Sequence, residues 1–270
     1  MARQFEAIAS FQNPKLKQIK RLRNKRDRER EQRFVIDDGR DLACALNCGY
    51  RVDYVLYCPS LADSDDSELI ARLNDNAIYE VPIQIIEKVS YRQNPSSILA
   101  VLHQKPRKGA DRFDEISDGP VLTLVNLKKP GNIGALLRTA DATGFKGIFL
   151  VDTALDLMNP NIIRSSTGAC FLGNVYIVNS DEALGFFTSR DYSVVSAIVE
   201  GDTSLFDATL HDNITIVLGT EDRGLSEFWQ KNADQRISIP MMGNLSDSLN
   251  VSVSGAVMMY EALRQRRFQR

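Results

Sequence analysis

Apolar residues in the second half of the chain fall in short continuous runs that are separated by helical patterns. Six such runs lie between residues 119 and 240, namely VLTLVNL, GIFLVD, NVYIV, SVVSAIV, ITIVLG and RISIP. Near-continuous Val, Ile and Leu is typical of strands buried on both faces, and intervening helices favour a parallel sheet. The pattern therefore predicts an α/β fold, in which ligands bind beyond the carboxyl ends of the strands.

The first part of the chain predicts a smaller α/β unit. Leu16, Ile19 and Leu22 have helical spacing, and the stretches RFVIDD, GRDLACALNCGY and RVDYVLYC predict a strand, a helix and a second strand. A helix at SELIARLNDN, a short extended piece at YEVPIQII and a strand at SILAVLHQ follow. The Pro, Gly and charged residues of KPRKGADRFDEISDGP then break the pattern. We therefore expect an N-terminal domain over residues 1–107, a linker over 108–118 and a larger domain over 119–270.

Composition narrows the class of protein. With 43% hydrophobic and 25% charged residues, the chain is typical of a soluble globular protein. Its start lacks the apolar core of a signal peptide, and no apolar run reaches membrane-spanning length, so we expect a cytoplasmic protein without a membrane partner. The four cysteines form no CxxC pair and the histidines are His103 and His211, so we expect no metal.

The net charge of −2 conceals a basic segment near the N-terminus. Between Lys15 and Arg33 there are ten Lys or Arg and three acidic residues. Such a segment is either a solvated helix face or part of a nucleic-acid surface, and its aromatic content is too low to decide.

The first candidate site follows the first strand of the larger domain, in NLKKPGNIGALLRTA. A loop with Pro130, Gly131 and Asn132 leads into a helix that carries Arg138. Glycines allow close backbone approach, and amides at a helix N-terminus suit a phosphate. The spacing matches neither a Walker loop nor a dinucleotide fingerprint, and a plain strand-to-helix turn remains the alternative.

Two further candidate sites follow later strands. In ITIVLGTEDRGLSEFW a strand runs into Gly219, followed by Glu221, whose carboxylate either serves a site or caps the next helix. In ISIPMMGNLSDSLNVSVSGAVMMYEALRQRR, Pro240 ends a strand and a polar loop leads to a helix. A helix cap explains one of Ser248 and Asn250, but not comfortably both.

Taken together, these motifs resemble those of the SpoU/TrmH family of SPOUT-class RNA methyltransferases. The stretches are NLKKPGNIGALLRTA (126–140), LGTEDRG (218–224) and IPMMGNLSDSLNVSV (239–253), in the family's order and spacing. The resemblance covers essentially all of residues 119–270. The first 107 residues resemble, more loosely, the L30e/L7Ae-like RNA-binding extension of many members, with Asp38-Gly39 where the family usually has Glu-Gly.

The resemblance implies an α/β SPOUT fold with a C-terminal deep trefoil knot, preceded by a small α/β RNA-binding domain. Family members transfer the methyl group of S-adenosylmethionine to a ribose 2′-hydroxyl of ribosomal or transfer RNA, without a metal. They form homodimers, with the active site completed across the interface. The resemblance assigns cofactor binding to six residues of this chain: Leu218, Gly219, Ile239, Met241, Ser248 and Leu249.

The resemblance also implies the catalytic set Arg138, Asn132, Glu221, Ser248 and Asn250. Because a guanidinium stays protonated, we interpret Arg138 as a phosphate clamp and hydroxyl organiser rather than a general base. Beside such a domain the basic segment favours RNA, since phosphate contacts supply most sequence-independent affinity. The candidate RNA-binding residues are Lys15, Lys20, Arg21, Arg23, Arg33 and Arg138.

The expected activity is therefore ribose 2′-O-methylation, with 23S ribosomal RNA favoured because of the N-terminal extension. Transfer RNA is the alternative substrate, and a non-catalytic RNA-binding SPOUT protein is the alternative role. Methylation of a base nitrogen is disfavoured by Arg138 and the Ser-Leu-Asn-Val motif. A nucleotide-dependent oxidoreductase lacks its glycine fingerprint.

Overall fold

The computed structural model describes residues 5–73, 77–210, 213–245 and 247–268, so His211 lies outside the described residues. Two compact units are present. Unit 1 contains residues 1–106 and 156–171, and unit 2 contains residues 107–155 and 172–270. Within the described residues, no helix is long and apolar enough to cross a membrane.

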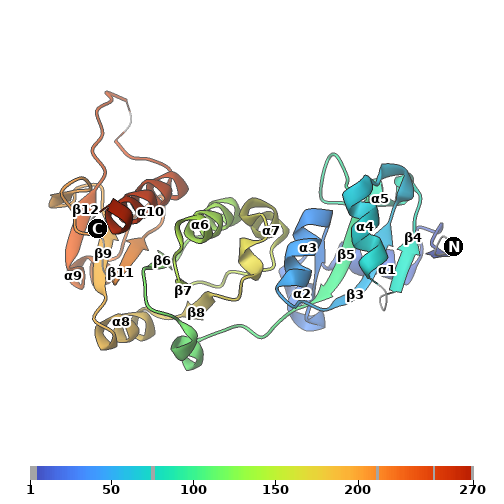
Figure 1. The fold of residues 1–270 in the computed structure, drawn as a ribbon, viewed down its shortest axis with the longest axis horizontal. Helices are drawn as coiled ribbons and strands as arrows, with labels where there is room; N and C mark the ends of the chain where they lie inside the picture. The colour runs from blue at the N-terminus through green and yellow to red at the C-terminus, as the bar shows by residue number, and fades with distance from the viewer. Residues whose placement is uncertain (1–4, 74–76, 211–212, 246, 269–270) are drawn as a thin grey trace. The chain divides into compact units, whose positions relative to one another are not determined.

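Unit 1 is a five-stranded mixed sheet with helices packed on it (Figure 1). The strand order is β1-β4-β3-β5-β2, and β5 runs antiparallel to both of its neighbours. Its elements are β1 (Glu6–Ala7), α1 (Pro14–Arg21), α2 (Lys25–Glu31), β2 (Arg33–Ile36), α3 (Gly39–Asn47), β3 (Val52–Tyr57), η1 (Pro59–Leu61), α4 (Ser64–Arg72), β4 (Ala77–Glu80), α5 (Ile83–Val89), β5 (Ile98–His103), α7 (Pro160–Ser166) and η3 (Ala169–Phe171).

The predicted strands and helices of this unit are confirmed, with two corrections. The piece YEVPIQII is extended only at its start, because the chain turns at Pro82 and α5 begins at Ile83. Helix α5 buries Ile85, Ile86 and Val89, whose spacing places them on one helix face against the sheet. The predicted first helix is also divided in two, since α1 ends at Arg21 and α2 begins at Lys25.

Unit 2 is a seven-stranded sheet with all strands parallel, in the order β10-β12-β9-β11-β6-β7-β8. This confirms the predicted fold class. Its elements are η2 (Ala110–Glu115), β6 (Val121–Val125), α6 (Pro130–Thr143), β7 (Gly147–Val151), β8 (Val175–Val178), α8 (Ser180–Ser189), β9 (Ser193–Ala197), β10 (Thr203–Ser204), β11 (Ile214–Leu218), α9 (Glu227–Lys231), β12 (Gln235–Ser238) and α10 (Val251–Phe268).

The order of strands in unit 2 explains where a ligand can bind. Strands β6, β7 and β8 extend the sheet in one direction, and the chain then continues on the other side of β6 with β11 and β9. Such a reversal leaves a crevice at the carboxyl ends of the central strands. All three sequence motifs lie after strands at this edge. The trefoil knot that the resemblance implies stays a prediction.

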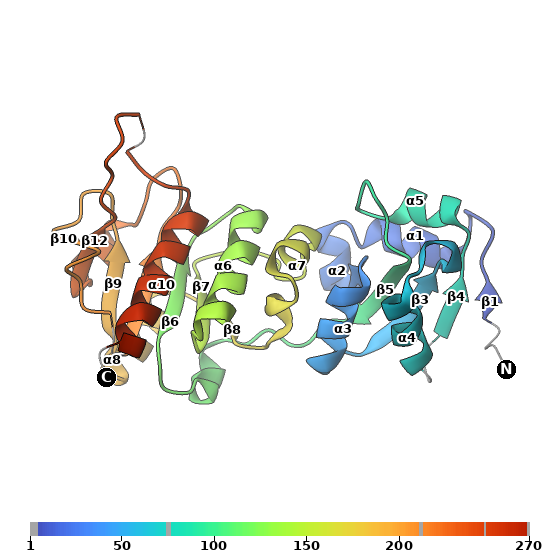
Figure 2. The ribbon, with the colours of Figure 1, turned by 45° about the horizontal axis from the view of Figure 1, so that its top comes forward.

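Helix α10 lies along α6 on one face of this sheet (Figure 2). The close approach depends on Gly255, because a Cβ at that position would lie 2.3 Å from Leu136 Cδ2 and 2.8 Å from Leu218 Cδ1. Glycine therefore lets the C-terminal helix pack directly over β11, the strand that leads into the second motif.

Within unit 1, the segment Asp156–Phe171 is held by a buried ion pair. Arg28 Nε lies 2.6 Å from Asp156 Oδ2, and the two side chains are 2% and 5% exposed. Arg28 Nη1 also donates to the carbonyls of Leu22 and Arg23, both at 2.7 Å. Phe171 completes the attachment by packing against Phe34. A buried charge needs such partners, so the pair fixes the segment in place.

Replacing Asp156 by alanine is expected to destabilise unit 1 by roughly 3–5 kcal/mol, because Arg28 would remain buried without its partner charge. Urea unfolding followed by circular dichroism measures the loss. Arg72→Ala is the control, since Arg72 and Glu68 form an exposed pair on α4 that is worth at most about 0.5 kcal/mol. Equal stability of the Asp156 variant and the control would refute the role of the buried pair.

Candidate cofactor and catalytic site

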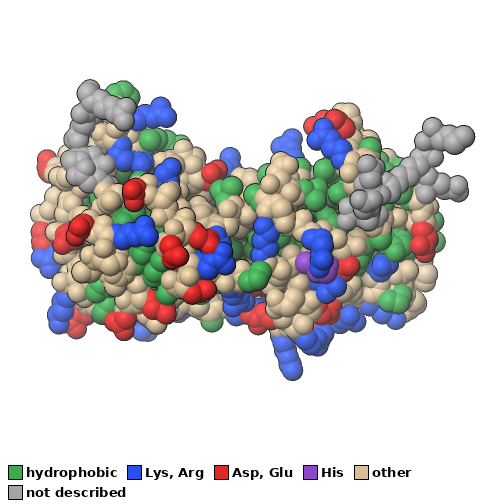
Figure 3. Space-filling model, turned by 60° about the horizontal axis from the view of Figure 1, so that its bottom comes forward, with side chains coloured by type: hydrophobic (Ala, Val, Ile, Leu, Met, Phe, Trp, Pro, Cys, Tyr) green, Lys and Arg blue, Asp and Glu red, His purple; other side chains and the backbone are tan. Residues whose placement is uncertain are grey.

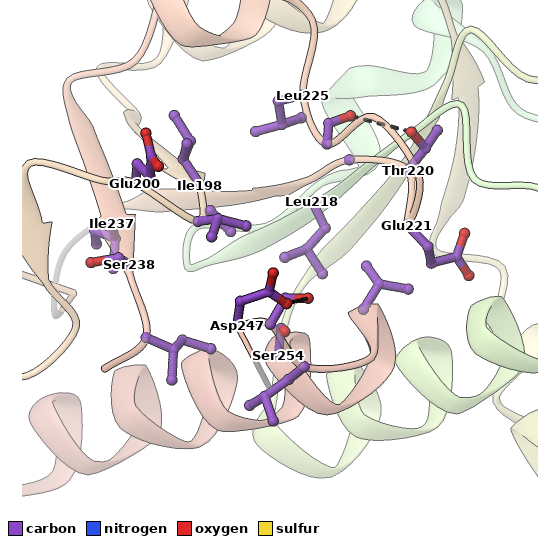
Figure 4. Close-up of a pocket in the computed structure, with 18 of the residues that line it drawn as sticks. Ile198, Glu200, Leu218, Thr220, Glu221, Leu225, Ile237, Ser238, Asp247 and Ser254 are labelled. Carbon is purple, nitrogen blue, oxygen red and sulfur yellow. Dashed lines mark hydrogen bonds between the residues drawn. The ribbon is translucent and has the colours of Figure 1, made fainter. Parts of the chain in front are cut away.

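A cavity of about 700 Å³ lies at the carboxyl ends of β9, β11 and β12 in unit 2 (Figure 4). This volume is in the usual range for sites that bind a small molecule or cofactor. Every residue to which the resemblance assigned cofactor binding lines it, namely Leu218, Gly219, Ile239, Met241, Ser248 and Leu249. These residues come from three separate stretches of sequence, which the fold brings to one place.

The shape of this cavity depends on the turn that follows β11. Thr220 and Gly224 exchange backbone hydrogen bonds of 3.1 and 2.9 Å, which fold the turn back on the strand end. Gly219 lies directly beneath it, because an added Cβ would be 2.3 Å from the carbonyl carbon and oxygen of Gly224. In the structure the backbone of Gly224 and Leu225 occupies the space that a side chain at this position would fill.

Both apolar and polar side chains line the cavity. Ile198, Leu218 and Ile237 supply apolar surface, while the Asp247 carboxylate points toward the middle of the cavity near Ser254 (Figure 4). Sequence reasoning missed Asp247, as well as the lining residues Ile198, Val199, Glu200, Thr220, Gln230 and Ser254. The segment around Ile198 carried only a strand signal, so nothing marked it as part of a site.

The residues that line the cavity fit the chemistry of S-adenosylmethionine. Its apolar surface suits an adenine ring, and the Asp247 carboxylate suits a cationic group. The backbone amides of Met241 and Leu249 have no acceptor among the described residues, so they can donate to a ligand. The carboxylate of Asp222 at the rim remains ionised, because a hydrogen bond from Thr220 lowers its pKa.

Glu221 joins the cavity to the first motif. Its Oε1 atom accepts a hydrogen bond from Asn132 Nδ2 and lies 3.5 Å from Lys129 Nζ. The alternative of a helix-capping Glu221 is not needed, because its side chain reaches back to the first turn of α6. The structure therefore brings Asn132 and Glu221 together across 89 positions of sequence.

The remaining predicted catalytic residues do not make direct contact with one another. Arg138 is exposed on α6 and has no hydrogen bond or ion pair to another described residue. Ser248 lines the cavity and its hydroxyl lies 3.4 Å from Asp247 Oδ1. Asn250 instead caps α10, because its Oδ1 accepts from the Ser252 amide at 2.9 Å and the Ser252 hydroxyl at 2.7 Å.

The first two valines of the helix after Asn250 have different surroundings. Val251 is buried beside the cavity, whereas Val253 is 46% exposed. The poor helix formers at the start of α10 are therefore explained only in part by packing beneath the loop.

Most predicted RNA-binding residues of the basic segment have partners within unit 1. Lys15 lies over the rings of Tyr54 and Tyr79, and Arg21 pairs with Glu31. Arg23 donates to the carbonyls of Val89 and Ser90, and Arg33 pairs with Asp53 at 2.6 Å. Lys20 is exposed and has no partner among the described residues. Most of these side chains are therefore engaged within unit 1, and Lys20 is available to a partner.

The strand order of this parallel sheet reverses beside the cavity, and loops fold over the strand ends. These features are typical of a cofactor-binding α/β domain. The particular family follows from comparison with known proteins. The SpoU rRNA Methylase family matches residues 119–260, and the MRM3-like substrate binding domain matches residues 13–100. The chain belongs to the SpoU rRNA Methylase family, as the resemblance of its three motifs predicted.

Characterised relatives share most of the chain. The 23S rRNA (uridine(2479)-2'-O)-methyltransferase of Streptomyces viridochromogenes is 31% identical over 90% of this chain and 86% of its own length. The crystal structure of an RNA 2'-O ribose methyltransferase superposes with a TM-score of 0.85 at 32% identity, covering 97% of this chain and 100% of that one. The SpoU methyltransferase AviRb from Streptomyces viridochromogenes, in complex with AdoMet, superposes with a TM-score of 0.83 at 28% identity, covering 94% and 99%.

Gly219→Ala is expected to weaken S-adenosylmethionine binding at least tenfold, because the new Cβ must displace the turn that forms one wall of the cavity. Isothermal titration calorimetry measures the affinity. Gly185→Ala on α8 is the matched control, since nothing lies within 4 Å of its Cβ position. Unchanged affinity in the Gly219 variant, with circular dichroism like that of the control, would contradict the role of the turn.

Proposed function

We propose that this chain methylates a ribose 2′-hydroxyl in RNA with S-adenosylmethionine as methyl donor, and that its substrate is 23S ribosomal RNA. The observation that carries the proposal is the convergence of the three motifs. One cavity is lined by all six proposed cofactor residues, and Glu221 ties it to Asn132 on α6. The names of the relatives support ribosomal RNA over transfer RNA.

The roles of the side chains follow from their placement. Bound S-adenosylmethionine supplies an electrophilic methyl group. Glu221 holds Asn132 in place at the start of α6, and Ser248 faces the cavity to orient the ribose. Asn250 acts indirectly, because by capping α10 it fixes the loop that carries Ser248.

Arg138 serves as the phosphate clamp and hydroxyl organiser in this proposal. It is exposed and has no partner among the described residues, so its five N–H donors are available to RNA. A guanidinium that stays protonated does not accept the hydroxyl proton, but it stabilises the negative charge that develops on the oxygen.

The proposed function predicts incorporation of radiolabelled methyl from S-adenosylmethionine into ribosomal RNA, recovered as a 2′-O-methylnucleoside after nuclease digestion. Arg138→Ala should reduce this transfer by roughly 100-fold or more while leaving cofactor affinity within about twofold, because Arg138 lies outside the cavity. Arg138→Lys should restore only part of the activity, since lysine lacks the planar fork.

Three outcomes would change this conclusion. Label found only in transfer RNA would replace the substrate, and a methylated base would replace the reaction. Cofactor binding without transfer to any RNA pool would favour the non-catalytic alternative. Loss of cofactor binding in the Arg138 variant would overturn the role given to that residue.

We also infer the division of labour, the compartment and the state of assembly. Residues 1–107 bind RNA and residues 119–270 carry the transfer, with 108–118 as linker. All four cysteines are free thiols, which suits the reducing cytoplasm. No group of His, Cys, Asp or Glu in the described part of the chain could hold a metal ion, and the proposed chemistry requires none.

The exposed face of α10 supports a homodimer. Val253, Val257 and Tyr260 are 46%, 37% and 55% exposed and follow one another at helical spacing. A stripe of apolar side chains on a surface helix favours burial against a second helix.

Val257→Glu is therefore expected to convert the protein from dimer to monomer, because a carboxylate would have to be buried in the interface. Size-exclusion chromatography with light scattering measures the mass. Thr188→Glu is the control, since it adds the same charge to an exposed position of α8. A wild-type protein that is monomeric at micromolar concentration would rule out this interface.

A further inference from the structure

A row of basic side chains lies at the ends of three adjacent strands of unit 1. Arg51 immediately precedes β3, His103 ends β5 and Arg33 begins β2. His103 is paired with Arg33 in the antiparallel register, and its amide donates to the Arg51 carbonyl at 2.9 Å. The sheet itself therefore places these three residues side by side.

The side chains of this row lie on the same face of the sheet. Arg51 Nη2 lies 3.3 Å from His103 Nδ1, and Asp53 lies between His103 and Arg33. Asp53 Oδ2 is 2.6 Å from Arg33 Nε, while its other oxygen is 3.9 Å from His103 Nε2. Among the described residues, Asp53 is the carboxylate of this cluster, and Arg51 pairs with none.

The histidine reports the sign of the local potential. Burial lowers the pKa of His103, Arg33 and Arg51 lower it further, and Asp53 opposes them with a smaller effect. The two guanidinium groups thus outweigh the carboxylate at the ring. In a neutral His103, Nδ1 accepts from Arg51 and Nε2 carries the proton. The Nε2 atom lies 3.9 Å from Asp53 Oδ1, too far for a hydrogen bond.

Lysine and arginine side chains lie near the histidine on this face, with acidic side chains also beside it (Figure 3). Lys105 is exposed two residues beyond His103, where its Nζ donates to the Cys48 carbonyl at 2.6 Å. By contrast, the acid-rich helix α4 carries Asp65, Asp66 and Glu68 elsewhere in the unit. The basic character is therefore local to this end of β5.

We propose that Arg51, His103 and Arg33 form a contact site for the phosphodiester backbone of RNA. Arg51 offers an exposed planar fork that matches two phosphate oxygens, and the free Nε2 proton of His103 offers a further donor. Arg33 is paired with Asp53 and holds that carboxylate in place, so the cluster keeps the net positive charge of Arg51. The inference rests on the proposed function, because an RNA substrate is what makes a phosphate backbone the partner.

RNA is favoured over an acidic protein for two reasons. Three donors spaced across neighbouring strands suit a chain of regularly repeated anions. The unit that carries them is also the part of the chain that matches a substrate binding domain. The row adds Arg51 and His103 to the expected RNA-binding residues, and it groups Arg33 with them.

The test compares RNA affinity of full-length variants over a series of KCl concentrations, with a fluorescein-labelled RNA hairpin as probe. Arg51→Ala should weaken binding several-fold and reduce the slope of log K against log salt by about one, as expected for one lost phosphate contact. Arg72→Ala on α4 is the matched control and should change neither quantity, since its exposed guanidinium already pairs with Glu68. Lys20→Ala tests the α1 segment in parallel.

A second measurement follows the imidazole proton resonances of His103 by NMR, assigned with His103→Gln among the two histidines of the chain. Saturating RNA should raise the pKa of His103, because a nearby phosphate stabilises the imidazolium. RNA affinity should then rise as the pH falls through the pKa of the bound state. Arg33, Arg51 and Asp53 are the charged groups that face the ring.

Wild-type affinity and salt slope in the Arg51 variant, together with a His103 pKa that RNA does not move, would overturn the proposal. Weakened binding of an acidic protein but not of RNA would assign the row to a different partner and also reject it. Methyl transfer separates this inference from the proposed function. If the protein methylates RNA but Arg51→Ala leaves RNA binding unchanged, the proposed function stands and the contact site is rejected. If the protein is inactive but Arg51→Ala weakens RNA binding, the contact site stands and the proposed function is rejected.

Discussion

Backbone contact at Gly219 is the constraint on which the site depends. The turn of Thr220–Gly224 can fold back on the end of β11 only because no side chain separates the two backbones. This fold-back places Glu221 where it reaches Asn132 and closes one side of the cavity. A second glycine, Gly255, brings α10 down onto the same strand. The absence of a Cβ at Gly219 and Gly255 thus allows three segments that are distant in sequence to pack together.

Catalytic and cofactor residues reach the site by different means. The cofactor residues belong to loops at strand ends, whose direction is fixed by the parallel sheet. The two candidate residues of α6 are placed differently. Asn132 is held by a hydrogen bond to Glu221, whereas Arg138 extends from the helix and has no partner among the described residues. Arg138, the residue proposed to contact RNA, is thereby available, and Asn132 is fixed by its hydrogen bond.

Sequence alone predicted the elements wherever the hydrophobic pattern was unambiguous. The apolar runs of unit 2 form the central strands, because short continuous runs of Val, Ile and Leu are typical of parallel strands that are buried on both faces. Helix α5 was missed, because its three buried apolar residues follow a proline and resemble a short strand. The cofactor-binding set could be predicted from motif resemblance, whereas Asp247 and Glu200 could not. Their position in the cavity depends on loop paths that no spacing rule describes.

The basic segment shows a further limit of prediction. Charge counts cannot distinguish Arg28, which is buried against Asp156, from Lys20, which is exposed. Nor can they show that Arg51 and His103, 52 positions apart, become neighbours across a sheet. Those relations belong to strand register, and register is fixed by long-range pairing.

The ion pair between Arg28 and Asp156 also bears on how this protein can be divided or recombined. Because unit 1 contains residues 156–171 as well as 1–106, the polypeptide passes between the units three times. A protein divided between its two matched family regions would have Arg28 and Asp156 on different pieces, and Phe171 would lose its contact with Phe34. Exchange of the N-terminal domain with that of a relative would therefore have to include a short piece of the methyltransferase sequence.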